Sequence, residues 1–506
     1  MTAAAKSPRN NSAAAWLPAG LAFGLPLLIY GLTLAPTIYN LDSAELTTAA
    51  ATGGLARATG YPLYLLLGRL WSLLPLGDIG FRMNLLSAVC GALTIGLTER
   101  ILRRLGAGPW ARLGALGLLA TAPFFWALSL VAEVYTLHTA LMAGFILLIL
   151  RWAERPTSGR LGAASAVLGL GLANHAATVL LLPGAAVFWW SQRRPANLRQ
   201  VAAGLAQAAP LLLGLALYLY LPLLSAGRPA FNYAGAYDAQ GVFRPVDLST
   251  PAGLGWLVSG QAFSGQMFAY DLAEMWAEVG EFGRQLWATF LAVGLGPGIL
   301  GAFVLLRRNG RFGLFLLLLF GANAFFYINY RVIDKNTMFL PVYLVWALWV
   351  GVGYQSVLDV LAAESGGRRW ALPWLGRAII LAAAAAALVY NWPRVDQSGD
   401  WSARQRGQAI LDRVAPGALL LGWWDTVPVV EYLQLVEGRR PDVTAINRFL
   451  IAGDDMEILI RNELPQRPVY INNPPTSLLR SYDAVRVGPV YRLLPRAPAV
   501  GSRSSG

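Results

Sequence analysis

The chain has 506 residues, of which 56% are hydrophobic and only 13% are charged. This composition excludes an ordinary soluble protein, in which about a quarter of residues are charged, and predicts a polytopic membrane protein. The formal net charge of +13 comes almost entirely from arginine. Because the arginines gather in short loops between apolar segments, topology accounts for the basic charge, and no nucleic-acid partner is expected.

Apolar segments long enough to cross a bilayer recur along the chain, since about 20 apolar residues span the hydrocarbon. We predict eleven crossings and interpret the first as a spanning helix rather than a cleaved signal peptide. The fifth and sixth segments are short, and they could instead form one long helix through His175. The predicted segments are Trp16–Pro36, Phe81–Leu102, Trp110–Leu130, Tyr135–Leu150, Leu161–Ala173, Ala176–Trp190, Val201–Leu224, Phe282–Leu306, Phe312–Ile328, Met338–Leu358 and Trp370–Asn391.

The distribution of arginine predicts the side on which each loop lies. Arg103 and Arg104 belong to one of several arginine-rich connections, whereas the alternate short loops around Glu133 and His175 contain no lysine or arginine. Under the positive-inside rule the amino terminus is then cytoplasmic and an odd number of crossings places the carboxyl terminus outside. The predicted parts are a cytoplasmic tail at 1–15 and a transmembrane domain at 16–394 with outer loops at 37–80 and 225–281.

After about Val395 the pattern changes to short strands alternating with helices, which predicts a small parallel α/β domain outside the membrane at 395–496. A disordered tail is expected at 497–506. No internal sequence repeat is found, which weakens a repeat-built transporter. The predicted helices are Ala403–Val414, Val427–Val436 and Asp454–Leu464, and the predicted strands are Ala418–Gly422, Asp442–Asn447, Pro468–Asn472 and Val490–Leu494.

Two carboxylates, Asp42 and Glu45, directly follow the first predicted span. If this segment is helical, the three-residue spacing puts both on one face, where they could act on one substrate at the membrane surface. The alternative is a capping box, in which Asp42 caps the helix and Glu45 closes the motif. The apolar segment Tyr61–Leu76 is interrupted by prolines and is predicted to be an interfacial helix on the outer face.

Further polar residues are predicted on the same outer face, where an ionisable group near the bilayer is a functional candidate. The alternatives are structural: Glu133 can cap a helix, His138 can be a satisfied buried histidine, Asn174 and His175 can complete a broken helix, and charged loop residues can form a solvated cluster. These candidates are Glu133, Tyr135, His138, Asn174, His175, Tyr330, Arg331, Asp334 and Lys335.

Several other chemistries lack their motifs. The two histidines do not have zinc-site spacing and Cys90 is the single cysteine, so no tight transition-metal site is predicted, and a need for a divalent metal is left open. The phosphate-binding loop, the dinucleotide-binding glycine motif and the hydrolase nucleophile elbow are absent from the sequence. No cofactor is therefore predicted.

A carboxylate beside cationic side chains on the outer face suits glycosyl transfer from a lipid-phosphate sugar. The leaving phosphate is stable as an anion, so it needs no general acid, whereas the acceptor hydroxyl needs a base and the phosphate needs a cation. Asp42 is the candidate base, and Arg57, Arg331 or Lys335 is the candidate phosphate ligand. Tyr61 and the other aromatic residues, with the interfacial helix, can contact a polyprenyl chain.

Several stretches together resemble GT-C type membrane glycosyltransferases related to the animal endoplasmic-reticulum protein O-mannosyltransferase that acts on plexin-type receptors, including its bacterial relatives. The likeness covers nearly the whole length, and the first three stretches in their order are fairly specific. The stretches are DSAEL at Asp42–Leu46, ATGYPLY at Ala58–Tyr64, RMNLLSAV at Arg82–Val89, EVYTLH at Glu133–His138, GLANH at Gly171–His175, DKNTMFLPVYL at Asp334–Leu344 and EGRRPDV at Glu437–Val443.

The resemblance implies that Asp42 is catalytic with Glu45 as its acidic companion. It also implies a polyprenyl-phosphate sugar donor, mannose before other sugars, a protein or glycolipid acceptor, and a place in the bacterial inner membrane. One departure is Arg57, which stands where relatives usually carry histidine. As a permanent cation, arginine can still hold a phosphate, but it cannot shuttle a proton.

Two other functions stay open at this point. A transporter or flippase of lipid-linked sugars would place charged residues at mid-membrane, where His138 is the one ionisable candidate. A non-enzymatic envelope protein would use the α/β domain to bind partners and would keep Asp42 away from any lipid-accessible cavity.

Overall fold

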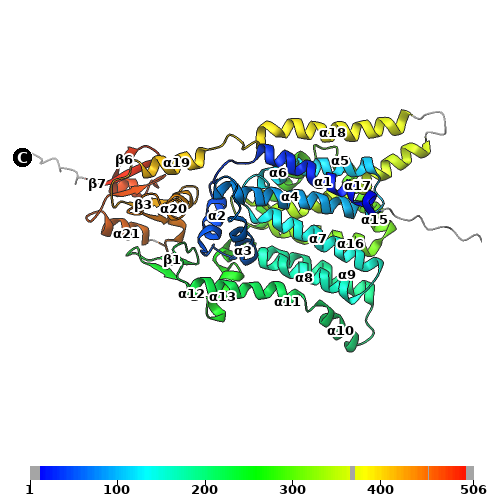
Figure 1. Cartoon of the computed structure of the whole chain (residues 1–506), viewed down its shortest axis with the longest axis horizontal. Helices are drawn as coiled ribbons and strands as arrows, with labels where there is room; N and C mark the ends of the chain where they lie inside the picture. The colour runs from blue at the N-terminus through cyan, green and yellow to red at the C-terminus, as the bar shows by residue number, and fades with distance from the viewer. Residues whose placement is uncertain (1–11, 365–370, 454, 497–506) are drawn as a thin grey trace, which may run out of the picture.

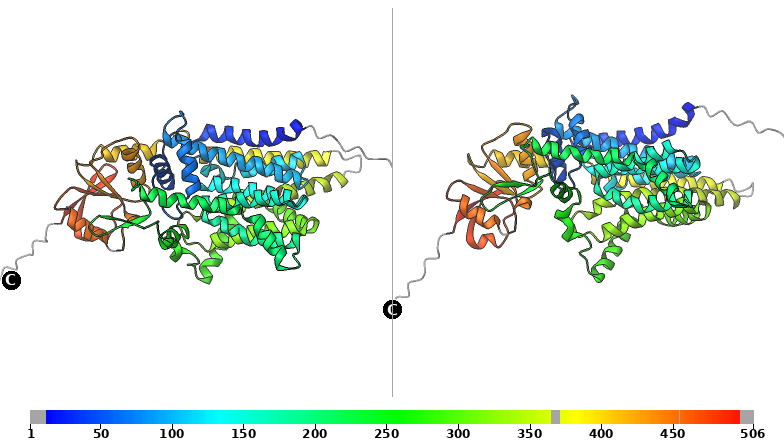
Figure 2. Two further views of the ribbon diagram at one scale, coloured as in Figure 1. Left: turned by 60° about the horizontal axis from the view of Figure 1, so that its bottom comes forward. Right: turned by 90° about the horizontal axis from the view of Figure 1, so that it is seen from below.

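The computed structural model describes residues 12–364, 371–453 and 455–496. It shows a bundle of long helices with a small α/β domain at one end (Figures 1 and 2). The predicted cytoplasmic tail is therefore covered only from Ser12, and the predicted disordered tail at 497–506 lies outside the described residues. The predicted architecture, a mainly helical polytopic bundle with a small carboxyl-terminal α/β domain, is confirmed.

Long helices form most of the bundle. Helix α17, which is apolar all round, is buried along nearly its whole length at the centre, as expected for a core helix. Helices α1 and α18 begin at the end of the bundle farthest from the α/β domain (Figure 1). The long helices are α1 (Ser12–Thr33), α4 (Ile79–Arg104), α7 (Val134–Glu154), α8 (Ser158–Asn174), α16 (Gly310–Ile328), α17 (Leu340–Glu364) and α18 (Ala371–Val395).

Within the described part of the chain, five helices are long and apolar enough to cross a bilayer, and a sixth candidate consists of two helices bent by 45°. The protein is therefore a multi-pass membrane protein, whereas the count of eleven crossings stays a prediction. Prolines explain much of the shortfall. The segment Trp110–Leu130 is divided before Pro123 into α5 (Pro109–Ala120) and α6 (Pro123–Leu128), since proline removes a helical hydrogen bond.

Other predicted spans are also divided. The segment Val201–Leu224 consists of α10 (Leu198–Ala208), α11 (Leu211–Leu215), η2 (Ala216–Leu219) and α12 (Tyr220–Ala226), with the bend near Pro210. The predicted single helix Phe282–Leu306 is wrong. It is replaced by α14 (Leu272–Thr289) and α15 (Leu295–Arg308), because Leu291 and Ala292 have positive φ values of 50° and 60° that end the first helix.

The alternative of one long helix through His175 is also wrong. Helix α8 ends at Asn174, and His175 is extended, with φ at −153°. A 3-10 helix, η1 (Ala176–Leu181), and α9 (Leu182–Arg193) follow. The short predicted break is therefore a real corner of the chain.

The α/β domain has a five-stranded sheet in the order β4-β3-β5-β7-β6. The predicted parallel pairing is correct for β4, β3 and β5, but β7 pairs antiparallel with β5 and with β6. Strand β6 was not predicted, and a tight turn at Gly488, with φ at 62°, joins it to β7. The strands are β3 (Leu419–Gly422), β4 (Thr444–Asn447), β5 (Val469–Ile471), β6 (Tyr482–Val487) and β7 (Val490–Pro495), and the helices are α19 (Ser402–Leu411), α20 (Val427–Leu435), η5 (Arg448–Leu450), α21 (Asp455–Glu463) and α22 (Leu478–Ser481).

Two short helices, α2 (Asp42–Thr52) and α3 (Pro62–Trp71), lie between the bundle and the α/β domain (Figure 1). Helix α3 replaces the longer interfacial helix predicted at Tyr61–Leu76, and its position at a membrane interface stays a prediction. The second segment predicted to lie outside, 225–281, contains a hairpin of β1 (Gly235–Tyr237) and β2 (Phe243–Pro245), then α13 (Pro251–Val258) and η3 (Gln261–Gln266).

Candidate active site

Helix α2 presents the two predicted acids. It begins at Asp42, and the preceding Leu41 occupies the cap position without any side-chain cap bond. The capping-box alternative is therefore wrong. Leu41 has a φ of 55°, a conformation that non-glycine residues rarely adopt and that is enriched at functional sites.

Arg57 is the shared partner of both acids. Its Nη2 donates to Oδ2 of Asp42, and its Nε lies 3.5 Å from Oε2 of Glu45. Its backbone N–H also donates a 2.7 Å hydrogen bond to Oε1 of Glu45. Arg57 is therefore part of the acidic centre.

The two acids have different environments. The side chain of Asp42 is 21% exposed, whereas that of Glu45 is 1% exposed. Burial raises the pKa of Glu45 to about 8, although the charge of Arg57 opposes this rise. Glu45 is therefore mostly protonated at neutral pH, and Asp42 is the carboxylate that a substrate can reach.

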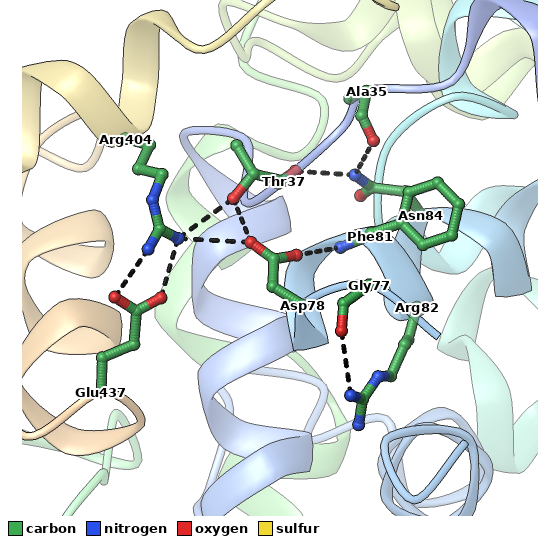
Figure 3. Close-up of polar contacts among 9 residues, drawn as sticks. All are labelled: Ala35, Thr37, Gly77, Asp78, Phe81, Arg82, Asn84, Arg404 and Glu437. Atoms are coloured by element: carbon green, nitrogen blue, oxygen red, sulfur yellow. Dashed lines mark hydrogen bonds and ion pairs between the residues drawn. The ribbon is translucent and has the colours of Figure 1, made fainter. Parts of the chain in front are cut away.

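Asn84 holds the segments that carry the acids. Its Nδ2 donates to the carbonyl oxygens of Ala35 and Thr37, at 2.9 and 2.8 Å (Figure 3). Its Oδ1 accepts from the backbone N–H of Ala132 at 2.9 Å. This fully buried amide thus joins the chain before Asp42 to the chain before Glu133, which gives the stretch RMNLLSAV a structural role.

Glu133 is a third acid at the site. It precedes α7 but makes no capping hydrogen bond, so the capping alternative is wrong. Its side chain is buried, and Oε2 has no hydrogen-bond partner among the described residues. Burial raises the pKa of Glu133 well above its ordinary value, and the charges of Asp42 and Asp334 raise it further.

Four predicted ring residues meet beside these acids. The ring of His175 lies 5.9 Å from Tyr61, 5.4 Å from Tyr135 and 5.5 Å from His138, measured between ring centres. His138 Nδ1 lies 3.1 Å from Thr178 Oγ1, whereas its Nε2 has no partner in the described part of the chain. The alternative of a fully satisfied histidine is therefore wrong.

Backbone contacts support the segments that carry these rings. Asn174 donates a 3.1 Å hydrogen bond to the carbonyl of Val134, which holds the end of α8 against the start of α7. Gly60 has a φ of 80°, and a Cβ at this position would lie 2.7 Å from Leu221 Cδ1. A side chain at this position, directly before Tyr61, would therefore be both strained and crowded.

Two cationic residues in the loop after α16, Arg331 and Lys335, pair with carboxylates of α14. Lys335 Nζ lies 2.6 Å from Glu278 and donates to the hydroxyl of Tyr270 at 2.9 Å. Arg331 pairs with Glu274 of the same helix, α14. Lys335 is buried, so the solvated-cluster interpretation does not hold for it.

Tyr330 and Asp334 instead interact electrostatically with the acidic centre. Burial raises the pKa of Tyr330, and the charge of Arg57 opposes this rise while Asp334 and Asp42 add to it. Tyr330 is also bridged through its backbone to Met267. Arg57 is thus the cation that directly contacts Asp42, while Arg331 and Lys335 are engaged by α14.

Two aromatic rings that sequence analysis did not single out contact Arg57. The guanidinium carbon lies 4.3 Å from the ring centre of Trp424 and 5.6 Å from that of Phe263. Trp424 belongs to the α/β domain, and no local pattern could have paired it with residue 57. Across the described residues, no group of three or more His, Cys, Asp and Glu side chains is placed to hold a metal ion.

The helical bundle, the loops that carry the acidic centre and the small sheet domain define a polytopic membrane protein of the GT-C fold. The solved structure of ArnT from Cupriavidus metallidurans in the apo state aligns with a TM-score of 0.58 at 13% identity, over 96% of this chain and 98% of ArnT. ArnT bound to undecaprenyl phosphate aligns with a TM-score of 0.55 at 14% identity, over 95% of this chain and 98% of that one.

The arabinofuranosyltransferase AftD from Mycobacteria aligns with a TM-score of 0.50 at 15% identity, over 95% of this chain and 40% of its own. In sequence, the family model described as Protein O-mannosyl-transferase TMEM260 N-terminal domain matches residues 42–198. The resemblance stated from the sequence is therefore confirmed, and the matched segment contains the acidic centre and the ring cluster.

Two relatives carry the name Protein O-mannosyl-transferase TMEM260. The mouse protein is 29% identical over 204 residues, which cover 39% of this chain and 29% of the relative. The Dictyostelium discoideum protein is 22% identical over 493 residues, which cover 85% of this chain and 57% of the relative. The chain therefore spans less than two thirds of the length of either relative.

Proposed function

We propose that the protein is a membrane glycosyltransferase that moves a sugar from a polyprenyl-phosphate donor to an acceptor hydroxyl, with Asp42 as the general base. The observation that carries the proposal is the partly exposed Asp42 carboxylate in direct contact with Arg57, in a chain with the fold of ArnT. The fold and family comparisons favour a transferase over a flippase or a partner-binding envelope protein.

The proposed step needs one base and one cation. An oxygen of Asp42 takes the proton of the acceptor hydroxyl as that hydroxyl oxygen attacks the anomeric carbon. The bond from this carbon to the phosphate oxygen breaks, and its electron pair stays on the departing phosphate. Attack opposite the leaving group inverts the anomeric configuration.

Arg57 is the best placed ligand for the departing phosphate. Its Nη2 and Nε face the acids, while its Nη1 makes no hydrogen bond to a described residue. A guanidinium binds phosphate through several N–H groups and keeps its charge at every working pH. Arg331 and Lys335 are weaker candidates, because carboxylates of α14 already pair with them.

The remaining predicted residues surround the acceptor and the sugar in this proposal. Glu133 and the rings of Tyr61, Tyr135, His138 and His175 form the wall next to Asp42. Aromatic rings and unpaired polar atoms together are typical of a ligand pocket. Asn174 supports this wall, and Tyr330 and Asp334 border it.

The donor, the acceptor and the location belong to the same proposal. Undecaprenyl phosphate occupies one ArnT structure, which supports a polyprenyl-phosphate donor. Mannose and a protein acceptor follow from the names of the relatives, with a glycolipid as the other acceptor class. We place the chain in a bacterial inner membrane, with a cytoplasmic amino terminus and the domain at 395–496 outside.

The test is sugar transfer by the purified full chain in detergent or nanodiscs, from polyprenyl-phosphate mannose and from other polyprenyl-phosphate sugars. Asp42→Asn is expected to abolish transfer, because asparagine cannot accept the proton. The matched control is Asp483→Asn in β6, where the side chain is 55% exposed. Folded Asp42→Asn protein that transfers sugar at the wild-type rate would overturn the assignment of the base.

A further inference from the structure

We propose that the α/β domain completes the catalytic centre, with Trp424 as the positioning residue that holds the Arg57 guanidinium in place for the donor phosphate. The inference rests on the proposed function, because it deepens the role given to Arg57. It assigns a task to a domain whose role the sequence left unknown.

The first observation is the contact itself. The guanidinium of Arg57 lies 4.3 Å from the ring centre of Trp424, within the range of a cation–π interaction. Trp424 is 7% exposed and packs into the large hydrophobic cluster of the helical bundle, although it belongs to the α/β domain. A contact shielded from water in this way is stronger than one on an open surface.

The second observation is that the Trp424 ring is itself fixed next to the Arg57 backbone. Tyr233 meets Trp424 edge to face, with 5.3 Å between ring centres. The backbone N–H of Tyr233 donates to the carbonyl of Leu55 at 2.9 Å, and the N–H of Leu55 donates to Phe231 at 3.0 Å. Leu55 precedes Arg57 by two residues, so one short bridge positions both members of the pair.

Tyr233 also reaches into the domain. Its hydroxyl donates to Oε2 of Glu431 on α20, and Asn447 of β4 contacts the same hydroxyl at 3.5 Å. Gly54 permits the close approach of this bridge, since a Cβ there would lie 2.6 Å from the carbonyl oxygen of Phe231. The domain therefore contacts the segment of Arg57 through both a ring and a carboxylate.

The third observation is that the α/β domain makes further polar and apolar contacts with the segments on either side of the acidic centre. Arg404 of α19 lies 3.2 Å from Asp78 and from Thr37, and 2.7 Å from Glu437 (Figure 3). Asp78 in turn caps α4 through the N–H of Phe81 at 2.7 Å. Ile38 and Ala44, at the start of the acidic segment, belong to the same hydrophobic cluster as α19 and α20.

These contacts give Trp424 a specific effect on chemistry. Asp42 attracts the guanidinium, Glu45 Oε2 lies 3.5 Å from its Nε, and Trp424 adds an uncharged surface that holds it without consuming an N–H donor. Nη2 of Arg57 already donates to Asp42, so without the ring the rest of the guanidinium is expected to turn about this contact. Its Nη1 would then no longer be held towards the donor phosphate. The affinity for the donor should therefore fall more than the turnover number.

The test compares Trp424→Leu, Trp424→Phe and Trp423→Leu in the full chain. Trp423 is the matched control, since it packs against Phe449 at a tilt, with 4.5 Å between ring centres, and is half-exposed. The readouts are binding of undecaprenyl phosphate in detergent micelles, followed by native mass spectrometry, and KM and kcat for a polyprenyl-phosphate sugar.

We expect Trp424→Leu to weaken undecaprenyl phosphate binding and raise the donor KM by about tenfold, while kcat changes less, since a shielded cation–π contact is lost. Trp424→Phe keeps a ring and should restore most of the affinity, and Trp423→Leu should match the wild type. Wild-type affinity in folded Trp424→Leu overturns the inference alone, as does a loss that Trp424→Phe does not restore. Wild-type protein that neither binds nor transfers overturns the proposed function and this inference together.

Discussion

The backbone N–H of Arg57 donates a 2.7 Å hydrogen bond to Oε1 of Glu45, which is 1% exposed. A buried carboxyl thus fixes the main chain of the residue whose side chain pairs with Asp42. Under the proposed function the two acids of DSAEL have separate tasks: Glu45 positions Arg57, and the more exposed Asp42 faces the substrate. This division is what the following predictions test.

Glu45→Gln should preserve most of the activity at neutral pH, whereas Glu45→Leu should lose it. Burial raises the pKa of Glu45 to about 8, so the wild-type side chain is mostly neutral at pH 7. Glutamine keeps the carbonyl oxygen that accepts from Arg57, and leucine removes it. Transfer rates of the two variants, measured with melting temperatures as a folding control, check this expectation. A Glu45→Gln variant as inactive as Glu45→Leu would contradict it.

The same carboxyl predicts a pH dependence of stability. The folded-state pKa of Glu45, about 8, lies above the unfolded value of about 4.3. Between these values the folded state binds more protons, so the free energy of unfolding falls as the pH rises. Thermal melting in detergent should show a smaller loss between pH 5 and pH 8 for Glu45→Gln than for the wild type. Equal losses would show that Glu45 is already ionised at low pH.

Arg57→His should make sugar transfer depend on pH. Histidine is cationic only below its pKa, which is about 6.5 when unperturbed. The variant should therefore transfer sugar at pH 5.5 and lose activity as the pH rises to 8, relative to wild type at each pH. Arg57→Gln is the neutral control and should be inactive at both. Flat activity of Arg57→His would mean that charge at this position does not serve the phosphate.

Much of the fold could be predicted, because long apolar segments and arginine-rich loops are local signals. The divisions at Pro123 and Pro210 were missed, because both residues lie inside segments predicted as single spans. The break between α14 and α15 depends on Leu291 and Ala292 in a left-handed conformation that their residue types do not signal. The antiparallel edge of the sheet was also missed, since no residue of β6 is fully buried and the strand carries Asp483 and Arg486.

Only those parts of the site whose residues lie close together in the sequence could be predicted. Asp42, Glu45 and Arg57 lie within 16 residues of one another, and the structure brings them together. The contact of Arg57 with Trp424 joins residues 57 and 424, which tertiary packing alone decides. Glu431 did give a signal, as a lone acid in the apolar helix VPVVEYLQL, but its partner Tyr233 lies in another domain.

Asn84→Ala should lower both stability and activity. The buried amide makes three hydrogen bonds to the backbone of Ala35, Thr37 and Ala132. Its removal leaves the buried carbonyl groups of Ala35 and Thr37 without this partner, while the N–H of Ala132 keeps only its 3.2 Å hydrogen bond to Ser43 Oγ. We expect a cost of about 2 kcal/mol and looser segments before Asp42 and Glu133. Melting temperature and transfer rate measure the two effects. Asn462→Ala is the control, because that amide is exposed and makes one 3.4 Å hydrogen bond. An unchanged transfer rate in folded Asn84→Ala protein would show that activity does not depend on the hydrogen bonds of Asn84.

Glu431→Gln should stabilise the docked domain at alkaline pH without stabilising it at acidic pH. Burial raises the pKa of Glu431 to about 8, and the charge of Glu45 adds to the rise, while the hydrogen bond from Tyr233 opposes it. Because this value lies above the unfolded pKa of about 4.3, the free energy of unfolding falls as the pH rises through the interval, and glutamine removes that dependence. Melting curves at pH 5 and pH 8.5 should therefore show a higher melting temperature for Glu431→Gln only at the higher pH.

Glu457→Gln, at an exposed position of the same domain, is the control and should follow the wild type at both pH values. A gain of equal size at both pH values would mean that the carboxyl is not the proton-binding group, and that the substitution acts through packing around Tyr233 instead.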